Sequence, residues 1–246
     1  MNVKTRRWLV VYGIVAHGLA ALLYWQNADL RATADGSAQF AAEQAGALCE
    51  SGCRYHAQMV EHLVQAAQVA ESTLHLAGDS IVAQLPAGSF GERALNLGIG
   101  GDLAVGLTYR ISRYPFIHPG HRTIVHIGIN DVLRGEDGRT VGTIREIVEA
   151  LASRGVIVVL SALLPVDEQA LGRPINARVR ELNAEMAKFC AAIANCRFAD
   201  AGRVMTDGTG QLRATLHTDD GVHLSADGYK IFVRVLREAL VRASSD

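Results

Sequence analysis

The sequence predicts an α/β fold in which helices cover both faces of a parallel sheet. From residue 72 onwards, short apolar runs alternate with longer amphipathic segments, as strand–helix–strand crossover units require. The first three apolar runs each lead into a turn rich in glycine, aspartate, serine or asparagine. Because open parallel sheets bind ligands beyond the carboxyl ends of their strands, we expect a functional site at these turns.

Length and charge limit the classes of protein that the chain can belong to. It has 246 residues and a formal net charge of −1, and its sequence pI is near 6.8. This length suits one domain with an extension. The near-neutral balance lacks the basic surface that nucleic-acid binding needs, so we expect no nucleic-acid partner.

The first 25 residues predict a membrane anchor. A basic segment comes first, with Lys4, Arg6 and Arg7, and an apolar run without Asp, Glu, Lys or Arg follows at 8–25. As a helix this run would be about 27 Å long, close to the hydrocarbon thickness of a bilayer. Aromatic residues flank it, namely Trp8, Tyr24 and Trp25. We therefore expect a single-pass signal anchor in the inner membrane, with the rest of the chain on the periplasmic side. A cleaved signal peptide is the alternative, with an A-x-A site at Ala32–Ala34.

Residues 26–71 predict a helical juxtamembrane linker. The segment is rich in alanine and glutamine, and apolar residues recur at helical spacing in its second half. These positions are Met59, Val60, Leu63, Val64, Ala67 and Ala70.

The remaining residues, 72–246, predict one α/β domain. Five apolar runs are the expected strands: 73–79, 94–100, 122–131, 155–165 and 196–202. Four segments between and after them are the expected long helices: 103–112, 140–154, 175–194 and 225–243. Ser225 is the expected N-cap of the last helix.

The four cysteines form two close pairs, Cys49 with Cys53 and Cys190 with Cys196. An exported chain meets oxidising conditions, so two local disulfides are the first expectation. Free buried thiols are an alternative for both pairs. A metal site with His56 is a weaker alternative for the first pair, because its spacing matches no common zinc pattern. We expect no metal and no cofactor.

Ser80 follows the first predicted strand and is a candidate nucleophile. Serine needs an adjacent base, usually histidine, that a third group orients. The segment "DDGVH" places Asp220 three residues before His223, close enough for the carboxylate to reach one imidazole nitrogen. The neighbouring Asp219 is an alternative partner, which the spacing disfavours.

Acyl transfer also needs donors for the oxyanion that forms when a carbonyl is attacked. Ser80 begins a predicted helix and therefore has a free backbone N–H. Gly101 can bring a second N–H close to a ligand, although Gly100 is an alternative. Asn130, after the third predicted strand, offers a side-chain amide.

Together these segments resemble the SGNH hydrolases, also called the GDSL esterase/lipase family. The resemblance covers about residues 72–246, and four motifs carry it: "GDS" at 78–80, "NLGIGGD" at 96–102, "GIND" at 128–131 and "DGVH" at 220–223. It implies a flavodoxin-like α/β/α sandwich with strand order 2-1-3-4-5 and no cofactor. It also implies Ser80 as nucleophile, His223 as base oriented by Asp220, and an oxyanion hole made by Ser80, Gly101 and Asn130.

The function we expect is ester hydrolysis through an acyl-enzyme, on the periplasmic side of the membrane. Pro86 interrupts the segment after Ser80, which favours short acyl groups such as acetyl esters of envelope or exported carbohydrate. The alternatives are acyl transfer by the same residues, lysophospholipid or thioester hydrolysis, and a non-catalytic scaffold with partners in envelope assembly.

Overall fold

The computed structural model describes residues 52–68, 73–85, 87–90 and 94–243. The predicted membrane anchor at 8–25 and most of the predicted linker lie outside these ranges. Among the helices within them, none has both the length and the apolar character that a bilayer crossing needs.

Five parallel strands form the sheet, in the order β2-β1-β3-β4-β5. The strands are β1 (Leu74–Gly78), β2 (Ala94–Gly98), β3 (Arg122–His126), β4 (Ile157–Ser161) and β5 (Cys196–Ala199). This confirms the predicted order. Gly78, the last residue of β1, pairs with Gly98 of β2 and His126 of β3. The carboxyl ends of these three neighbouring strands are therefore level, and the turns after them converge.

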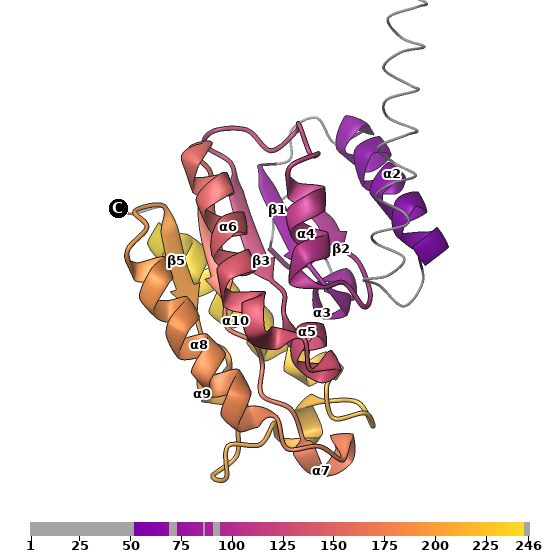
Figure 1. The fold of residues 1–246 in the computed structure, drawn as a ribbon, viewed down its shortest axis with the longest axis vertical. Coiled ribbons are helices and arrows are strands. Elements are labelled where there is room, and N and C mark those ends of the chain that lie inside the picture. Colours follow the sequence, from indigo (N-terminus) through magenta and orange to yellow (C-terminus); the bar gives the residue numbers. More distant parts are fainter. Residues whose placement is uncertain (1–51, 69–72, 86, 91–93, 244–246) are drawn as a thin grey trace, which may run out of the picture.

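Helices cover both faces of the sheet (Figure 1). One face carries α4 (Ala104–Ile111), α6 (Thr140–Ser153) and α8 (Asn176–Ala191), and α10 (Ala226–Ala243) lies on the other. The shorter elements are α3 (Ser80–Ala83), η1 (Ala87–Phe90), α5 (Ile129–Arg134), η2 (Asp137–Arg139), α7 (Glu168–Leu171), α9 (Gly202–Met205) and η3 (Ala214–Leu216). Because neither face of β1 meets solvent, all five of its residues are buried.

The predicted third strand, 122–131, is too long by five residues. β3 ends at His126, and Ile129 begins helix α5 instead of continuing the strand. Gly128 causes the change, because its φ of 122° lies outside the range of an extended strand. This turn moves Asn130 from the end of a strand to the first turn of a helix.

Helix α2 (Gly52–Gln68) packs on the α/β domain, although the sequence assigned this region to a linker. Its buried face contains Tyr55, Met59 and His62, and His62 Nδ1 lies 2.7 Å from the Tyr114 hydroxyl. Of the expected apolar stripe, Val60, Leu63 and Val64 are exposed. The apolar periodicity predicted the wrong buried face for most of the stripe, because Tyr55 and His62, which carry polar groups, lie on the face that packs against the domain.

Cys190 and Cys196 form a disulfide, as one of the sequence alternatives predicted. It joins the last turn of α8 to the first residue of β5, with 5.3 Å between the Cα atoms. The predicted pair Cys49–Cys53 lies outside the described side chains, and the proposed metal site with it.

Replacing both Cys190 and Cys196 with serine is expected to lower the free energy of unfolding by about 2 kcal/mol, because the short cross-linked loop no longer restricts the unfolded chain. Urea unfolding of the two proteins without reductant measures this difference. Adding dithiothreitol to both proteins should abolish this difference, because it removes the Cys190–Cys196 bond from the wild type. Equal midpoints for wild type and variant would show that the bond contributes nothing.

Candidate active site

Ser80 is the first residue of α3, directly beyond the carboxyl end of β1. Asp79 caps this helix, because its Oδ1 accepts a hydrogen bond of 3.0 Å from the Ile81 N–H. A Cβ atom at Gly78 would lie 2.0 Å from the His126 carbonyl oxygen, so only glycine allows β1 to approach β3 so closely at this point. The serine hydroxyl is thus held at the sheet edge by a capped turn.

His223 lies in the loop before α10 and contacts Ser80 directly. Its Nε2 lies 2.9 Å from the Ser80 Oγ, and its Nδ1 lies 2.5 Å from Asp220 Oδ2. The structure therefore brings together the three residues that the sequence predicted as nucleophile, base and orienting group. Asp219, the alternative partner, is exposed.

Asp220 is held in its ionised form. Partial burial opposes ionisation, but hydrogen bonds from His223, from the Val222 and His223 N–H groups and from Thr218 keep the pKa of its carboxyl well below the usual range. A charged carboxylate beside Nδ1 favours the tautomer in which Nε2 is free to accept a proton.

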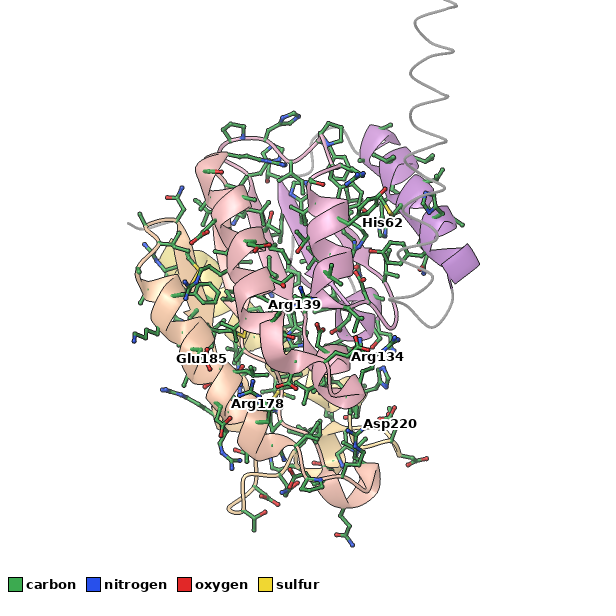
Figure 2. The ribbon with its side chains drawn as sticks, in the orientation of Figure 1. His62, Arg134, Arg139, Arg178, Glu185 and Asp220 are labelled. Atoms are coloured by element: carbon green, nitrogen blue, oxygen red, sulfur yellow. A yellow bond between two sulfur atoms is a disulfide. The ribbon has the colours of Figure 1, made fainter. Side chains whose placement is uncertain are left out.

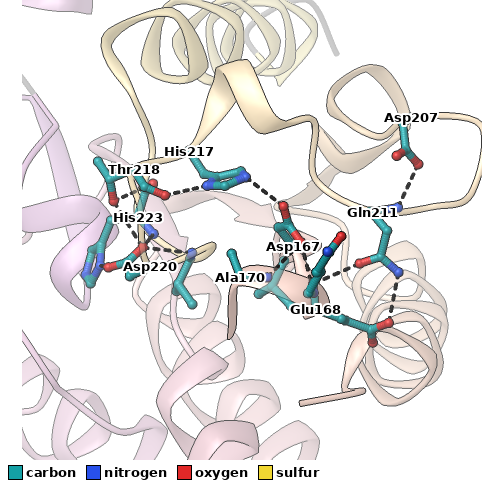
Figure 3. Close-up of polar contacts among 12 residues, drawn as sticks. Asp167, Glu168, Ala170, Asp207, Gln211, His217, Thr218, Asp220 and His223 are labelled. Carbon is teal, nitrogen blue, oxygen red and sulfur yellow. Dashed lines mark hydrogen bonds and ion pairs between the residues drawn. The ribbon is translucent and has the colours of Figure 1, made fainter. Parts of the chain in front are cut away.

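The loop that carries Asp220 and His223 is anchored to helix α7 (Figure 3). The His217 Nδ1 contacts the Thr218 carbonyl oxygen, and its Nε2 lies 3.1 Å from Asp167 Oδ2. The other oxygen of Asp167 caps α7. Tyr229 adds a second anchor on α10, donating a hydrogen bond of 2.9 Å to the Ile81 carbonyl. These contacts hold the imidazole over Ser80.

Two of the three predicted oxyanion donors, Gly101 and Asn130, follow β2 and β3. Gly101 has a φ of 76° and lies in a tight turn. A 3.2 Å hydrogen bond from the Asp102 N–H to the Ile99 carbonyl closes this turn. Asn130 is half-buried on α5, and its Nδ2 donates 2.9 Å to the Asp102 carbonyl. This bond fixes the amide against the Gly101 turn and uses one of its two hydrogens.

Three buried aspartates stand next to these residues in the chain: Asp79 before Ser80, Asp102 after Gly101 and Asp131 after Asn130. Burial, together with the charges of Asp102 and Asp131, raises the pKa of Asp79 to about 7. Burial likewise raises the pKa of Asp131 to about 6. The sequence motifs did not predict the burial of these aspartates.

Sequence reasoning also missed Arg110, whose side chain is fully buried behind the site. The signal was present in the chain. Arg110 lies three residues after Leu107 and six after Ala104, on the face of α4 that packs into the core. A lone arginine on the apolar face of a short amphipathic helix indicates a buried ion pair.

The site is open to solvent. The His223 side chain is 31% exposed and that of Asp220 is 49% exposed. Figure 2 shows Asp220 in the lower part of the molecule, below Arg134 of α5.

The chain belongs to the GDSL-like lipase/acylhydrolase family, whose model matches residues 66–231. This membership makes it a carboxylic ester hydrolase. No curated protein matches the chain.

Solved structures share the fold. A GDSL-like lipase from Bacteroides thetaiotaomicron is 20% identical with a TM-score of 0.65, covering 77% of this chain and 98% of its own. A Streptococcus pneumoniae structure described as a platelet activating factor is 23% identical with a TM-score of 0.66. The match covers 74% of this chain and 90% of that one. A lipase/acylhydrolase from Enterococcus faecalis is 23% identical with a TM-score of 0.56, covering 70% and 96%.

Proposed function

We propose that this chain hydrolyses esters through an acyl-enzyme on Ser80, with His223 as general base and Asp220 as orienting group. The observation that carries the proposal is the continuous hydrogen-bonded chain from the Ser80 Oγ through both imidazole nitrogens to Asp220. This is the arrangement that activates a serine hydroxyl at neutral pH.

In the first half-reaction, the Ser80 Oγ attacks the ester carbonyl carbon while its proton passes to the His223 Nε2. The tetrahedral intermediate collapses, the bond to the alkoxy oxygen breaks, and the imidazolium returns the proton to the leaving alcohol. In the second half-reaction, His223 takes a proton from water, which attacks the acyl group on Ser80. On collapse the bond between the acyl carbon and the Ser80 Oγ breaks, the imidazolium returns its proton to Oγ, and the carboxylic acid leaves.

The negative oxygen of each intermediate is assigned to three donors: the N–H of Ser80, the N–H of Gly101 and the second amide hydrogen of Asn130. The Asp102 carbonyl already binds the first of the two Asn130 hydrogens, and this orients the amide before substrate arrives. Donors fixed in advance do not need to reorganise during the reaction, which is why they stabilise the transition state strongly.

We infer a preference for short acyl groups from a small interior cavity whose lining includes chain neighbours of the proposed site residues. A cavity of about 10 Å³ is lined by Ile81, His126, Ile129, Leu164, Val166 and Val222. Three of these residues, Ile81, Ile129 and Val222, are chain neighbours of Ser80, Asn130 and His223. A space of this size accommodates a group about as large as one water molecule, and this supports acetyl over long acyl chains.

The natural substrate we propose is an O-acetyl ester of envelope or exported carbohydrate, reached from the periplasmic face of the inner membrane. The basic N-terminus and the apolar run at 8–25 support a membrane tether. The Cys190–Cys196 disulfide supports an oxidising compartment.

A series of p-nitrophenyl esters tests the acyl preference. We expect kcat/KM to be highest for the acetyl ester and to fall by about tenfold or more once the chain reaches about eight carbons, because the small cavity cannot admit the additional methylenes. Acetylated xylan and lysophosphatidylcholine, compared at equal ester concentration, extend the test to natural classes of substrate. A preference for the octanoyl ester or for the lysophospholipid would reject the short-acyl proposal.

A further inference from the structure

Arg110 is a fully buried guanidinium that binds three different groups at the carboxyl ends of β1 and β2. Its Nη1 donates 2.6 Å to the Leu97 carbonyl, and its Nη2 donates 3.0 Å to the Gly78 carbonyl. Its Nε and Nη2 both bind Asp102 Oδ2, at 3.0 and 2.6 Å. Burying this charge is costly, and a rigid fork of donors with matching acceptors is what offsets the cost.

Two of the groups that Arg110 binds, the Gly78 carbonyl and Asp102, adjoin the turns that carry the proposed backbone donors. Gly78 ends β1, two residues before Ser80, and Asp102 directly follows Gly101. The same guanidinium therefore holds the nucleophile turn and the glycine turn. The Ile99 N–H adds a direct 3.0 Å bond between these turns, to the Gly78 carbonyl.

Helix α4 is shaped to bring Arg110 to this position. A Cβ atom at Gly106 would lie 2.1 Å from Asp102 Oδ1, so the helix can approach the carboxylate only because residue 106 is glycine. Asp102 Oδ1 also accepts 3.0 Å from the Leu103 N–H. Asp131, the neighbour of Asn130, accepts 3.2 Å from the Ala104 N–H, which links the third donor to the same helix.

We propose that Arg110 is a positioning residue for ester hydrolysis: its guanidinium fixes the Ser80 and Gly101 N–H groups relative to each other, so that both point at the same oxyanion. The proposal rests on the ester hydrolase function of Ser80. Arg110 acts through the Gly78 carbonyl, the Leu97 carbonyl and Asp102, and does not touch the substrate. An error of about 1 Å in such donors costs on the order of 100-fold in rate.

Two variants test this role. Arg110→Lys keeps the charge opposite Asp102 but lacks the fork, so it cannot reach all three acceptors together. The double variant Arg110→Met with Asp102→Asn removes both charges and leaves neither unpaired. Leu151→Ala is the matched control, because Leu151 is fully buried in α6, and its truncation destabilises the fold without involving the two turns.

The readout must separate geometry from folding. One aliquot of each protein is labelled to completion with a fluorophosphonate, which counts the competent serines. The kinetics of p-nitrophenyl acetate hydrolysis are measured on a second, unlabelled aliquot, and kcat is expressed per competent serine. We expect kcat per site to fall by about 10- to 100-fold in both Arg110 variants with KM within about twofold, since the lost contacts serve the transition state. The rate of phosphonate labelling should fall in parallel, whereas Leu151→Ala should keep the wild-type kcat per site.

A folded Arg110→Lys protein with wild-type kcat per site would overturn the proposal and leave Arg110 a purely structural residue. Arg110→Lys decides the question alone if the double variant does not fold, and circular dichroism identifies that case. A wild-type chain that neither labels nor hydrolyses the ester would reject the ester hydrolase function itself, and the role of Arg110 with it. Failure of the Arg110 proposal is therefore seen in the Arg110→Lys variant, and failure of the ester hydrolase function is seen in the wild type.

Discussion

Replacing Ser80 with alanine is expected to reduce kcat for p-nitrophenyl acetate by about 10⁴- to 10⁶-fold, because no other group at the site can form the acyl-enzyme. The substitution removes a half-buried hydroxyl and its 2.9 Å bond to the His223 Nε2. The Asp79 cap of α3 uses the Ile81 N–H and not the serine side chain, so the helix should remain. Turnover and the melting temperature are measured on the same preparation.

Ser89 of η1 is a suitable control for Ser80→Ala, since its change to alanine also removes one half-buried hydroxyl but lies outside the proposed site. Ser89→Ala should keep wild-type turnover. His223→Ala should match Ser80→Ala, because the two residues act as one unit. A folded Ser80→Ala protein that retains more than about one tenth of the wild-type kcat would contradict the nucleophile assignment, since a lost nucleophile costs several orders of magnitude.

The second large effect is expected at Asp220. Asp220→Asn should lower kcat by about 10³- to 10⁴-fold and leave detectable residual activity, because the asparagine amide can favour the wrong imidazole tautomer. Asparagine keeps an oxygen that can accept from the Val222 and His223 N–H groups, as Asp220 Oδ1 does, so the loop should keep its shape. Steady-state kinetics with p-nitrophenyl acetate provide the measurement.

Asp219→Asn is the matched control, with the same chemical change one residue earlier at an exposed position. We expect it to keep the wild-type kcat. Full activity in Asp220→Asn together with a large loss in Asp219→Asn would assign the orienting role to Asp219. Full activity in both variants would show that Ser80 and His223 work as a dyad.

The sheet could be predicted from the sequence because its strands are compact apolar runs with a turn residue at each end. The five strands and their order follow from this alternation and from the family resemblance. The error at 122–131 arose because Ile127 and Ile129 continue the apolar pattern of β3 and are buried like a strand. The positive φ of Gly128 shows that the chain has already turned before Ile129, and this backbone angle cannot be read from the amino-acid sequence.

The site could be predicted as far as its residues follow strands or stand close together in the chain. Ser80, Gly101 and Asn130 satisfy the first condition, and the Asp220–His223 pair satisfies the second. What the sequence could not supply is the support behind them. Arg110 contacts Gly78 across 32 positions and Leu97 across 13, and no local pattern identifies such partners.

Helix α2 shows the limit of apolar periodicity on its own. Helical spacing predicted the helix correctly, but its packed face depends on which side meets the domain. His62 is buried there beside the Tyr114 hydroxyl, and Tyr55 packs with Met59 and Ile99. Val60 and Val64 stay exposed. Apolar periodicity shows that a helix has distinct faces, but tertiary contacts determine which face is buried.

Covalent labelling of Ser80 in the purified chain by a fluorophosphonate, with the modified peptide identified by mass spectrometry, tests the nucleophile assignment most directly. Phosphonylation requires a serine that is activated by a base and faces an oxyanion hole. We expect one adduct, on Ser80, that forms in the wild type, forms much more slowly in His223→Ala and is absent from Ser80→Ala. A folded wild-type protein that does not react, or reacts at another serine, would contradict this assignment.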